Sequence, residues 1–408
     1  MTLSNKVHCP YRQARLIQSA IAPDKMRVAF LLGAGSPVSI RVPSATGTEP
    51  LMPDIAALTT QVNAKLNANP AVASTFAKVC ARAASGKPKS PTVEEILSCV
   101  RTLHEVAGGT GIDGMTKDAL GDLDKQICSY ITDVVKARLP NDDTPYHQLA
   151  SWIGGVRRSN PVEAFTPNYD LLLEQALEER RVPYFDGFVG GDATFFELGS
   201  MEQDALPARW ARLWKLHGSI NWWRTPNGEV QRHRERSAPE DRQMIYPSHL
   251  KYDDSRRMPY LAMLDRLRAF LNHGQAVLIT CGYSFGDQHL NEVILQGLNG
   301  NPTAVCFGLI YGDRAGSPEA VTRAKRQANL SVLAVDGAVL GTIDADWDTE
   351  AKTADPMHDL AVVQADLTGR TSAPADRSKF LLGDFAAFGK FLAHQLSHLD
   401  LLDGSANV

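Results

Sequence analysis

A short apolar run that ends in a glycine turn, VAFLLGAGS at residues 28–36, constrains this chain more than any other segment. The run has the composition of a buried strand, and Gly33 and Gly35 stand at its carboxyl end. Glycines at such a place let the backbone approach a phosphate group closely, as in dinucleotide-binding α/β proteins. Taken alone, the same turn also fits a tight connection between a strand and a helix. The choice between the two interpretations depends on the rest of the chain.

Three later segments favour a ligand site. They are FTPNYD at 165–170, KLHGS at 215–219 and CGYSFGDQHLN at 281–291. Each places polar side chains at the end of a short apolar run. In an open α/β sheet, the carboxyl ends of the strands border a crevice in which ligands bind.

The remaining pattern predicts an α/β fold with a Rossmann-like, mainly parallel sheet and helices on both faces, plus a helical insertion. Short β-branched runs alternate with helical segments, which is typical of such sheets. An amphipathic helix is expected near 11–21, and another helix is expected at 170–179. The expected strands are 27–32, 162–166, 212–216, 276–281, 304–310 and 330–335.

We expect residues 1–54 and 151–340 to form the Rossmann-like domain, and residues 55–150 to form the helical insertion. Within the insertion, Thr92 and Glu95 have the spacing of a capping box ahead of an apolar run. The glycine-rich segment 107–114 follows no expected strand, so we interpret it as a loop between helices.

The C-terminal part, residues 341–408, is expected to form a helical tail that packs either on the core or on a partner. The residues that mark an amphipathic helix or pair of helices there are Phe380, Phe385, Phe388, Phe391 and Leu392.

Composition argues against several classes of protein. Among 408 residues the formal net charge is −4, which gives no broad electrostatic basis for binding nucleic acid. The six cysteines are scattered, and no C-x-x-C pair is present to build a tetrahedral zinc site. The first residues lack the apolar core of a signal peptide, and no apolar run approaches the roughly 18 residues that span a bilayer. We therefore expect a cytoplasmic protein that binds no zinc, membrane or nucleic acid.

In their order and spacing, the four segments resemble the sirtuin family over the stretch from about Val28 to Asp336. The resemblance is closest to bacterial sirtuin-like proteins of antiviral defence, which hydrolyse NAD. It implies a Rossmann-type fold, NAD as the substrate and cleavage of the bond between nicotinamide and ribose. Relatives of this size resemble those that act beside a separate HerA-type ATPase in large assemblies. A homo-oligomer and a HerA-type ATPase partner are thus implied as well.

The resemblance also assigns roles to residues. His217 of KLHGS matches the histidine of the sirtuin HG pair, and an imidazole can accept a proton near neutral pH. Asn168 of TPNYD matches the asparagine beside the nicotinamide ribose, where an amide can donate and accept hydrogen bonds. These two are the candidate catalytic residues. The candidate cofactor-binding residues are Gly33, Ala34, Gly35, Ser36, Asp54, Asp170, Gly282, Ser284 and Asn291.

Several of these assignments have a structural alternative. Asp54 corresponds loosely to the segment that covers the nicotinamide pocket in sirtuins, although the arginine of that segment is missing here. Asp170 also fits the cap of the helix that follows it. Ser284 matches the sirtuin residue that receives the adenine-side ribose and phosphate, and Asn291 is a weaker candidate for that ribose. His289 fits either a capping role or the nucleotide.

Three departures from deacetylase sirtuins favour hydrolysis of NAD over deacetylation. Paired cysteines are missing, a helical insertion follows the first motif, and IYPSHLK at 245–251 replaces the peptide-binding Phe-Gly-Glu loop. Residues 224–259 are polar and are expected to loop out where deacetylases carry a zinc module. An NAD-dependent protein deacetylase and a catalytically silent subunit that binds NAD or ADP-ribose remain the alternatives.

Overall fold

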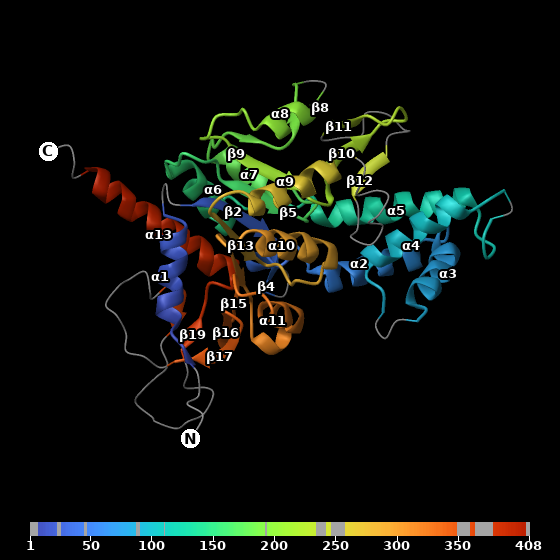
Figure 1. Cartoon of the computed structure of the whole chain (residues 1–408). Coiled ribbons are helices and arrows are strands. Elements are labelled where there is room, and N and C mark those ends of the chain that lie inside the picture. Colours follow the sequence, from blue (N-terminus) through green and yellow to red (C-terminus); the bar gives the residue numbers. More distant parts are fainter. Residues whose placement is uncertain are drawn as a thin grey trace, which may run out of the picture.

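The structure is a computed structural model that describes residues 7–22, 26–44, 47–86, 90–109, 111–191, 194–233, 242–245, 258–348, 360–363 and 378–404. A ten-stranded sheet runs through its centre, in the order β1-β17-β16-β15-β14-β13-β2-β5-β9-β6 (Figure 1). Along the chain these strands are β1 (Val7–His8), β2 (Arg27–Leu32), β5 (Glu163–Thr166), β6 (Tyr184–Phe185), β9 (Ala211–Lys215), β13 (Ala276–Cys281), β14 (Ala304–Leu309), β15 (Leu330–Leu333), β16 (Gly337–Leu340) and β17 (Ile343–Trp347).

The chain crosses the middle of this sheet in the order of a Rossmann-like fold. From β2 it moves outward to β5 and β9, then returns to β13 on the other side of β2 and continues to β14 and β15. These neighbours pair in parallel, whereas β16 is antiparallel to both β15 and β17. The strand order reverses between β2 and β13, and Leu32 pairs with Cys281 at their carboxyl ends. The predicted fold class is confirmed, and such a reversal is where α/β sheets bind ligands.

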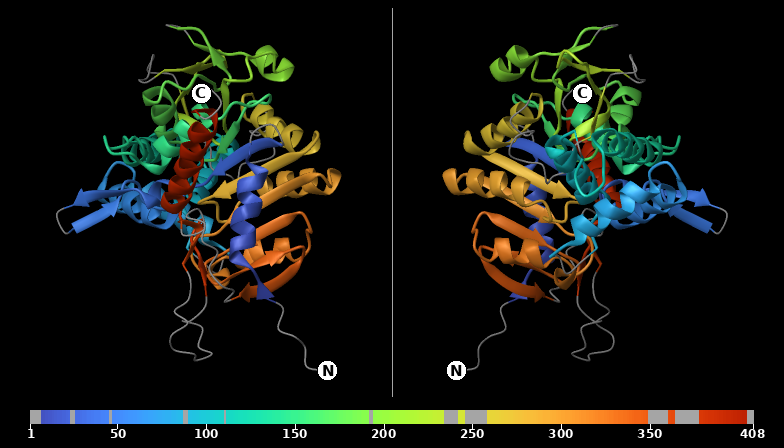
Figure 2. Two further views of the ribbon diagram at one scale, coloured as in Figure 1. Left: turned by 90° about the vertical axis from the view of Figure 1, so that its left-hand side faces the viewer. Right: turned by 90° about the vertical axis from the view of Figure 1, so that its right-hand side faces the viewer.

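Helices cover both faces of the sheet, because alternate side chains of each strand point to opposite sides. In β2, Phe30 and Leu32 join one hydrophobic cluster, and Ala29 and Leu31 join the other. Figure 2 shows α9 and α10 on one side of the sheet and α13 on the other. The first cluster contains residues of α1 (Pro10–Ala20), α6 (Pro145–Gly155), α7 (Leu172–Glu179) and α13 (Phe385–Gly404). The second contains residues of α9 (Tyr260–Asn272), α10 (Gln288–Gly300) and α11 (Pro318–Ala324).

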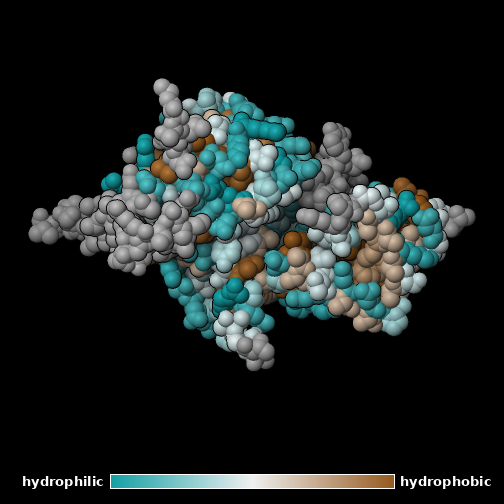
Figure 3. All heavy atoms as spheres, turned by 90° about the horizontal axis from the view of Figure 1, so that it is seen from below, coloured by the Kyte–Doolittle hydropathy of each residue, from teal (hydrophilic) through white to brown (hydrophobic). Residues whose placement is uncertain are grey.

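A helical region separates β2 from β5 and extends to the right of the sheet in Figure 1. Its helices are α2 (Ile55–Ala68), α3 (Ala73–Ala84), α4 (Val93–Val106) and α5 (Lys117–Val135). The predicted capping box is present, since Thr92 accepts a hydrogen bond from the Glu95 N–H and Glu95 accepts one from the Thr92 N–H. The segment between α4 and α5 contains one isolated bridge, from Ile112 to Met115, and otherwise lacks strands in its described part. Seen from below, tan residues gather over this region, whereas teal residues cover much of the central body (Figure 3).

Two short elements lie in the loop after the glycine turn. They are a 3₁₀ turn (Pro37–Ser39) and a hairpin of β3 (Arg41–Ser44) and β4 (Gly47–Pro50). Asp54 then caps α2, because its side chain accepts a hydrogen bond from the Ala57 N–H at 2.8 Å.

A smaller antiparallel sheet lies above the main one in Figure 1 and consists of β10 (Gly218–Arg224), β11 (Val230–Arg232) and β12 (Arg242–Ile245). Two of its strands fall in the stretch 224–259 that was expected to loop out, so that expectation is wrong for them. Residues 234–241 and 246–257, with most of IYPSHLK, lie outside the described residues. Other short elements nearby are β7 (Phe188–Val189), β8 (Phe195–Phe196) and α8 (Leu198–Gln203).

Near the C-terminus, α13 packs against α6, and its Phe388 ring lies 6.1 Å from that of Phe30 in β2. Phe385, Phe391 and Leu392 are buried in the same cluster. Phe380 lies instead in β19 (Lys379–Phe380), which pairs with β18 (Val362–Val363), so it does not belong to the helix as expected. Within the described residues, no helix combines the length and apolar character needed to span a bilayer.

Candidate active site

A cavity of about 610 Å³ lies at the carboxyl ends of β2, β5, β9 and β13. The strand-end loops form one wall, and the helical region forms the other. Eight of the residues predicted from the sequence line it, namely Ala34, Gly35, Asp54, Asn168, Asp170, His217, Gly282 and Ser284. Gly33, Ser36 and Asn291 do not line it.

The glycine turn and the loop after β13 touch backbone to backbone. The N–H groups of Gly33 and Gly35 donate to the carbonyls of Cys281 and Gly282, each at 2.9 Å. A Cβ on Gly33 would stand 2.3 Å from the Gly282 carbonyl oxygen, and one on Gly282 would stand 2.3 Å from the Ser36 nitrogen. Gly282 also has a φ of +61°, which side chains disfavour. Glycine is therefore required here for the close approach of two loops.

These contacts engage most of the backbone N–H groups in the turn that was expected to approach a phosphate group. Besides the two glycines, the Ser36 N–H donates to the Gly33 carbonyl at 3.0 Å, and the Ser36 hydroxyl donates to the Cys281 carbonyl at 3.0 Å. Gly33 and Ser36 thus stabilise the loops that line the cavity without lining it themselves. Ala34, Gly35, Gly282 and Ser284 present the loops to the cavity itself.

Asn168 connects the loop after β5 to the loop after β2. Its side-chain amide donates to the Gly33 carbonyl at 3.1 Å, and its backbone N–H donates to the Thr166 hydroxyl at 3.0 Å. Thr166 in turn donates to the Leu32 carbonyl at 2.7 Å. Asn168 is therefore held at the edge of the cavity by a side-chain contact with the loop after β2 and by a backbone contact with Thr166 of β5.

His217 stands in the turn after β9, and its Nε2 lies 3.1 Å from an Asp287 carboxylate oxygen. Both side chains are largely buried, with 12% and 10% of their surface exposed. The other Asp287 oxygen accepts hydrogen bonds from the N–H groups of His289 and Leu290, which places Asp287 at the N-cap of α10. His289 thus participates in the first turn of this helix through its backbone.

Asp287 is the partner that sequence reasoning missed. The signal was available, because Asp287 follows β13 within the same CGYSFGDQHLN segment and precedes a helix. The carboxyl ends of parallel strands meet at one edge of a sheet, so a side chain after β13 can reach one after β9.

Asp170 lies at the back of the cavity beside a buried lysine. Its side chain accepts a hydrogen bond from the Leu172 N–H at 3.0 Å, so α7 begins at Leu172 rather than at Asp170. Lys215 donates to the Asp170 carbonyl oxygen and, at 3.2 Å, to Glu174. Burial raises the pKa of both carboxyl groups, although the Lys215 ammonium opposes that rise.

The Asn291 side chain stabilises a loop by hydrogen bonds and does not line the cavity, where a ribose contact was predicted. It is buried, donates to the Phe285 carbonyl at 2.7 Å and accepts a hydrogen bond from the Tyr283 hydroxyl at 2.9 Å. Asn291 thereby holds the loop that carries Gly282 and Ser284.

Carboxyl groups dominate the polar lining of the cavity. They belong to Asp54, Glu94, Glu95, Asp170 and Asp287, and none of the described lining residues is a lysine or an arginine. Such a lining favours a ligand group that carries or develops positive charge. Among the described residues no group of three or more His, Cys, Asp and Glu side chains could hold a metal ion, and none of the six cysteines forms a disulfide.

Residues 162–333 match the sequence model of the SIR2-like domain. The chain carries a SIR2-like domain. The matched stretch contains Asn168, His217 and Asp287, whereas the glycine turn and the helical wall lie outside it.

Solved structures of Sir2 proteins are similar to this chain at low identity. A Sir2 homologue in complex with NAD has 13% identity and a TM-score of 0.35, and the match covers 78% of this chain and 89% of that one. A Sir2 enzyme has 9% identity and a TM-score of 0.33, with 74% and 85% covered. A Sir2 homologue variant in complex with ADP-ribose has 16% identity and a TM-score of 0.32, with 72% and 84% covered. None of the curated proteins compared with the chain matches it.

Proposed function

We propose that this chain hydrolyses NAD at the bond between nicotinamide and ribose and releases nicotinamide and ADP-ribose. The observation that carries the proposal is the pair of His217 and Asp287, 3.1 Å apart, in a cavity that Asn168 also lines. The SIR2-like domain contains all three residues.

The leaving group explains why the reaction needs no general acid beside these residues. Nicotinamide in NAD is a cationic pyridinium, so its nitrogen takes the electron pair of the breaking C–N bond without a general acid. The ribose becomes oxocarbenium-like, as in glycoside hydrolysis, and a water oxygen forms the new bond to the anomeric carbon. His217 accepts the proton that this water loses, and the Asp287 carboxylate stabilises the resulting imidazolium. Asn168 is placed to hold a ribose hydroxyl or the water.

The other lining residues suggest how NAD would lie. We propose that Ala34, Gly35, Gly282 and Ser284 face its phosphate groups and adenine-side ribose, and that Asp54 and Asp170 face the nicotinamide end. The carboxylates near that end would stabilise the positive charge that develops on the reacting sugar.

The experiment measures nicotinamide release from NAD by the purified chain over a series of protein concentrations. His217→Ala is expected to lower the rate by about 100-fold or more, the scale of a lost general base. Asn168→Ala is expected to lower it by about 100-fold, the scale of one lost hydrogen-bonding group at the reacting centre. His273→Ala, which removes an exposed histidine in the turn after α9, is the matched control. Wild-type activity in both His217→Ala and Asn168→Ala would contradict the assignment of these two residues as catalytic.

The same assay separates the alternatives. Nicotinamide release that depends on an added acetylated peptide would indicate a deacetylase. NAD or ADP-ribose binding without turnover, measured by calorimetry, would indicate a silent binding subunit.

The resemblance to defence proteins supports a wider proposal. We propose that the hydrolase acts in the cytoplasm as a homo-oligomer beside a HerA-type ATPase and depletes NAD during phage infection. Mass measurements with and without such an ATPase, combined with the nicotinamide assay, test the assembly. Loss of protection from phage in cells that carry His217→Ala would be the matching cellular result.

A further inference from the structure

The helical region forms part of the wall around His217 and Asn168. Thr92, Glu94 and Glu95 at the start of α4 line the cavity, together with Leu58 of α2 and Val135 of α5. All of them lie outside residues 162–333, which match the SIR2-like domain. The match therefore assigns no part in the reaction to them.

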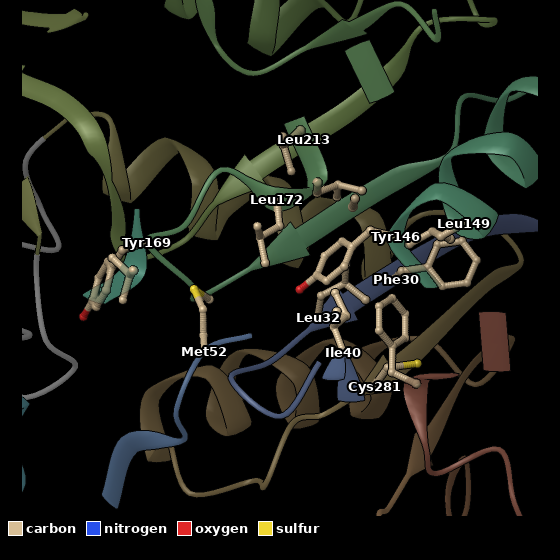
Figure 4. Close-up of a cluster of buried hydrophobic side chains, with 14 of the residues drawn as sticks. Phe30, Leu32, Ile40, Met52, Tyr146, Leu149, Tyr169, Leu172, Leu213 and Cys281 are labelled. Carbon is tan, nitrogen blue, oxygen red and sulfur yellow. The ribbon is translucent and has the colours of Figure 1, made fainter. Parts of the chain in front are cut away.

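Glu94 reaches across the cavity wall to Tyr169, the residue that follows Asn168. The Tyr169 hydroxyl donates a hydrogen bond to a Glu94 carboxylate oxygen at 3.1 Å. Burial raises the pKa of Tyr169 well above its ordinary value, so its hydroxyl stays protonated and remains a donor. Figure 4 shows Tyr169 at the margin of the hydrophobic cluster, with its hydroxyl directed away from Phe30 and Leu32.

Tyr169 also contacts the segment that carries His217. Its backbone carbonyl accepts hydrogen bonds from the Ile220 N–H at 3.1 Å and from the Ser219 hydroxyl at 3.4 Å. Tyr169 is thus joined to Asn168 by the chain, to the turn after His217 by its carbonyl, and to the helical region by its hydroxyl. Only the last of these three links depends on a side chain from outside the SIR2-like domain.

We propose that Glu94 is a positioning residue, which holds Tyr169 by a hydrogen bond and thereby fixes Asn168 relative to His217 for the reaction. The inference rests on the proposed hydrolysis of NAD. It makes the helical region a component of the active site, through a contact whose two partners can be altered separately.

Three variants distinguish the effect of losing this hydrogen bond from the effects of losing the charge of Glu94 or of disturbing the fold. Glu94→Ala removes the acceptor, Tyr169→Phe removes the donor and keeps the buried ring, and Glu94→Gln keeps an acceptor oxygen without the charge. Glu105→Ala is the matched control, because Glu105 is an exposed carboxylate on the same helix.

The measurement is kcat and KM for nicotinamide release, with the thermal midpoint of each variant recorded. Glu94→Ala and Tyr169→Phe are each expected to lower kcat by about 10-fold or more, the scale of a lost hydrogen bond to a charged group, with KM within about 3-fold of wild type. The double variant should be no slower than the slower single variant, since both remove one contact. Glu94→Gln should recover most of kcat, and Glu105→Ala should match wild type.

Wild-type kcat in both Glu94→Ala and Tyr169→Phe would overturn the inference without contradicting the proposed hydrolysis of NAD. Additive losses in the double variant, or a loss in Glu94→Gln as large as in Glu94→Ala, would also overturn it. A wild-type chain that releases no nicotinamide at any concentration overturns the proposed function, and the inference falls with it.

Discussion

The two walls of the cavity are built by different means. The strand-end wall is fixed by backbone contacts, in which the turn at Gly33 and Gly35 is hydrogen-bonded to the loop at Gly282 with no room for a Cβ. The helical wall is fixed by side chains, through the capping box of Thr92 and Glu95 and through apolar residues such as Val93, Ile96 and Leu97 beneath it. We therefore expect a single substitution in the strand-end wall to cause a large loss in the free energy of unfolding, and one in the helical wall to cause a small loss.

The largest effect is expected at the tightest backbone contact. Gly282→Ala combines a positive φ with a Cβ that would stand 2.3 Å from the Ser36 nitrogen and 2.6 Å from the Gly35 carbonyl carbon. Backbone strain and overpacking together predict a loss of roughly 3 to 5 kcal/mol in the free energy of unfolding. Urea denaturation measures it, and NAD binding should be lost as the loops separate.

Gly286→Ala is the control for this prediction, because it adds the same methyl group to the same loop. Its Cβ would meet only the Ser284 hydroxyl, at 3.2 Å, and its φ is not in the left-handed region. Equal losses in the two alanine variants would show that the loop tolerates no side chain in general, and the contrast between the walls would lose its main support.

The same contrast explains what the sequence could and could not predict. Asn168 and His217 follow short apolar runs, and parallel strands bring such ends to one edge, so their convergence on one cavity follows from local pattern. Glu94 lies in a segment whose pattern indicates only an amphipathic helix with a cap, because where that helix docks depends on contacts far away in sequence. Asn291 shows the converse, since it follows the end of β13 but its polar side chain holds the loop of Gly282 and Ser284 instead of lining the cavity.

The strand-end wall also contains a buried carboxyl group. Burial raises the pKa of Asp170 above its ordinary 3.8, so the folded chain holds this proton more tightly than the unfolded chain does. The contribution of Asp170 to the free energy of unfolding is then largest below that ordinary pKa, and it falls as the pH rises through the raised value, by at most about 1.4 kcal/mol per pH unit for one proton. Asp170→Asn should reduce this slope, while Glu174, whose pKa burial also raises, keeps part of it.

Urea denaturation at a series of pH values above about 4 measures the slope. Asp118→Asn, which removes an exposed carboxylate at the start of α5, controls for the change in net charge. If Asp170→Asn and wild type lose stability in parallel as the pH rises, the buried carboxyl of the strand-end wall does not titrate between the folded and unfolded states as argued.

The smallest effect tests whether the helical wall matters to the reaction as well as to the fold. Thr92→Ala removes the cap of α4, and Thr116→Ala removes the equivalent cap of α5, where Thr116 accepts from the Ala119 N–H at 3.2 Å. Each should lower the free energy of unfolding by about 1 kcal/mol. Only Thr92 adjoins Glu94 and lines the cavity, so only Thr92→Ala should also lower kcat for NAD. If the two variants lose equal stability but only Thr92→Ala lowers kcat, the position of the helical wall affects Asn168 and His217. If the two variants have equal kcat values, the helical wall encloses the cavity but has no part in the reaction.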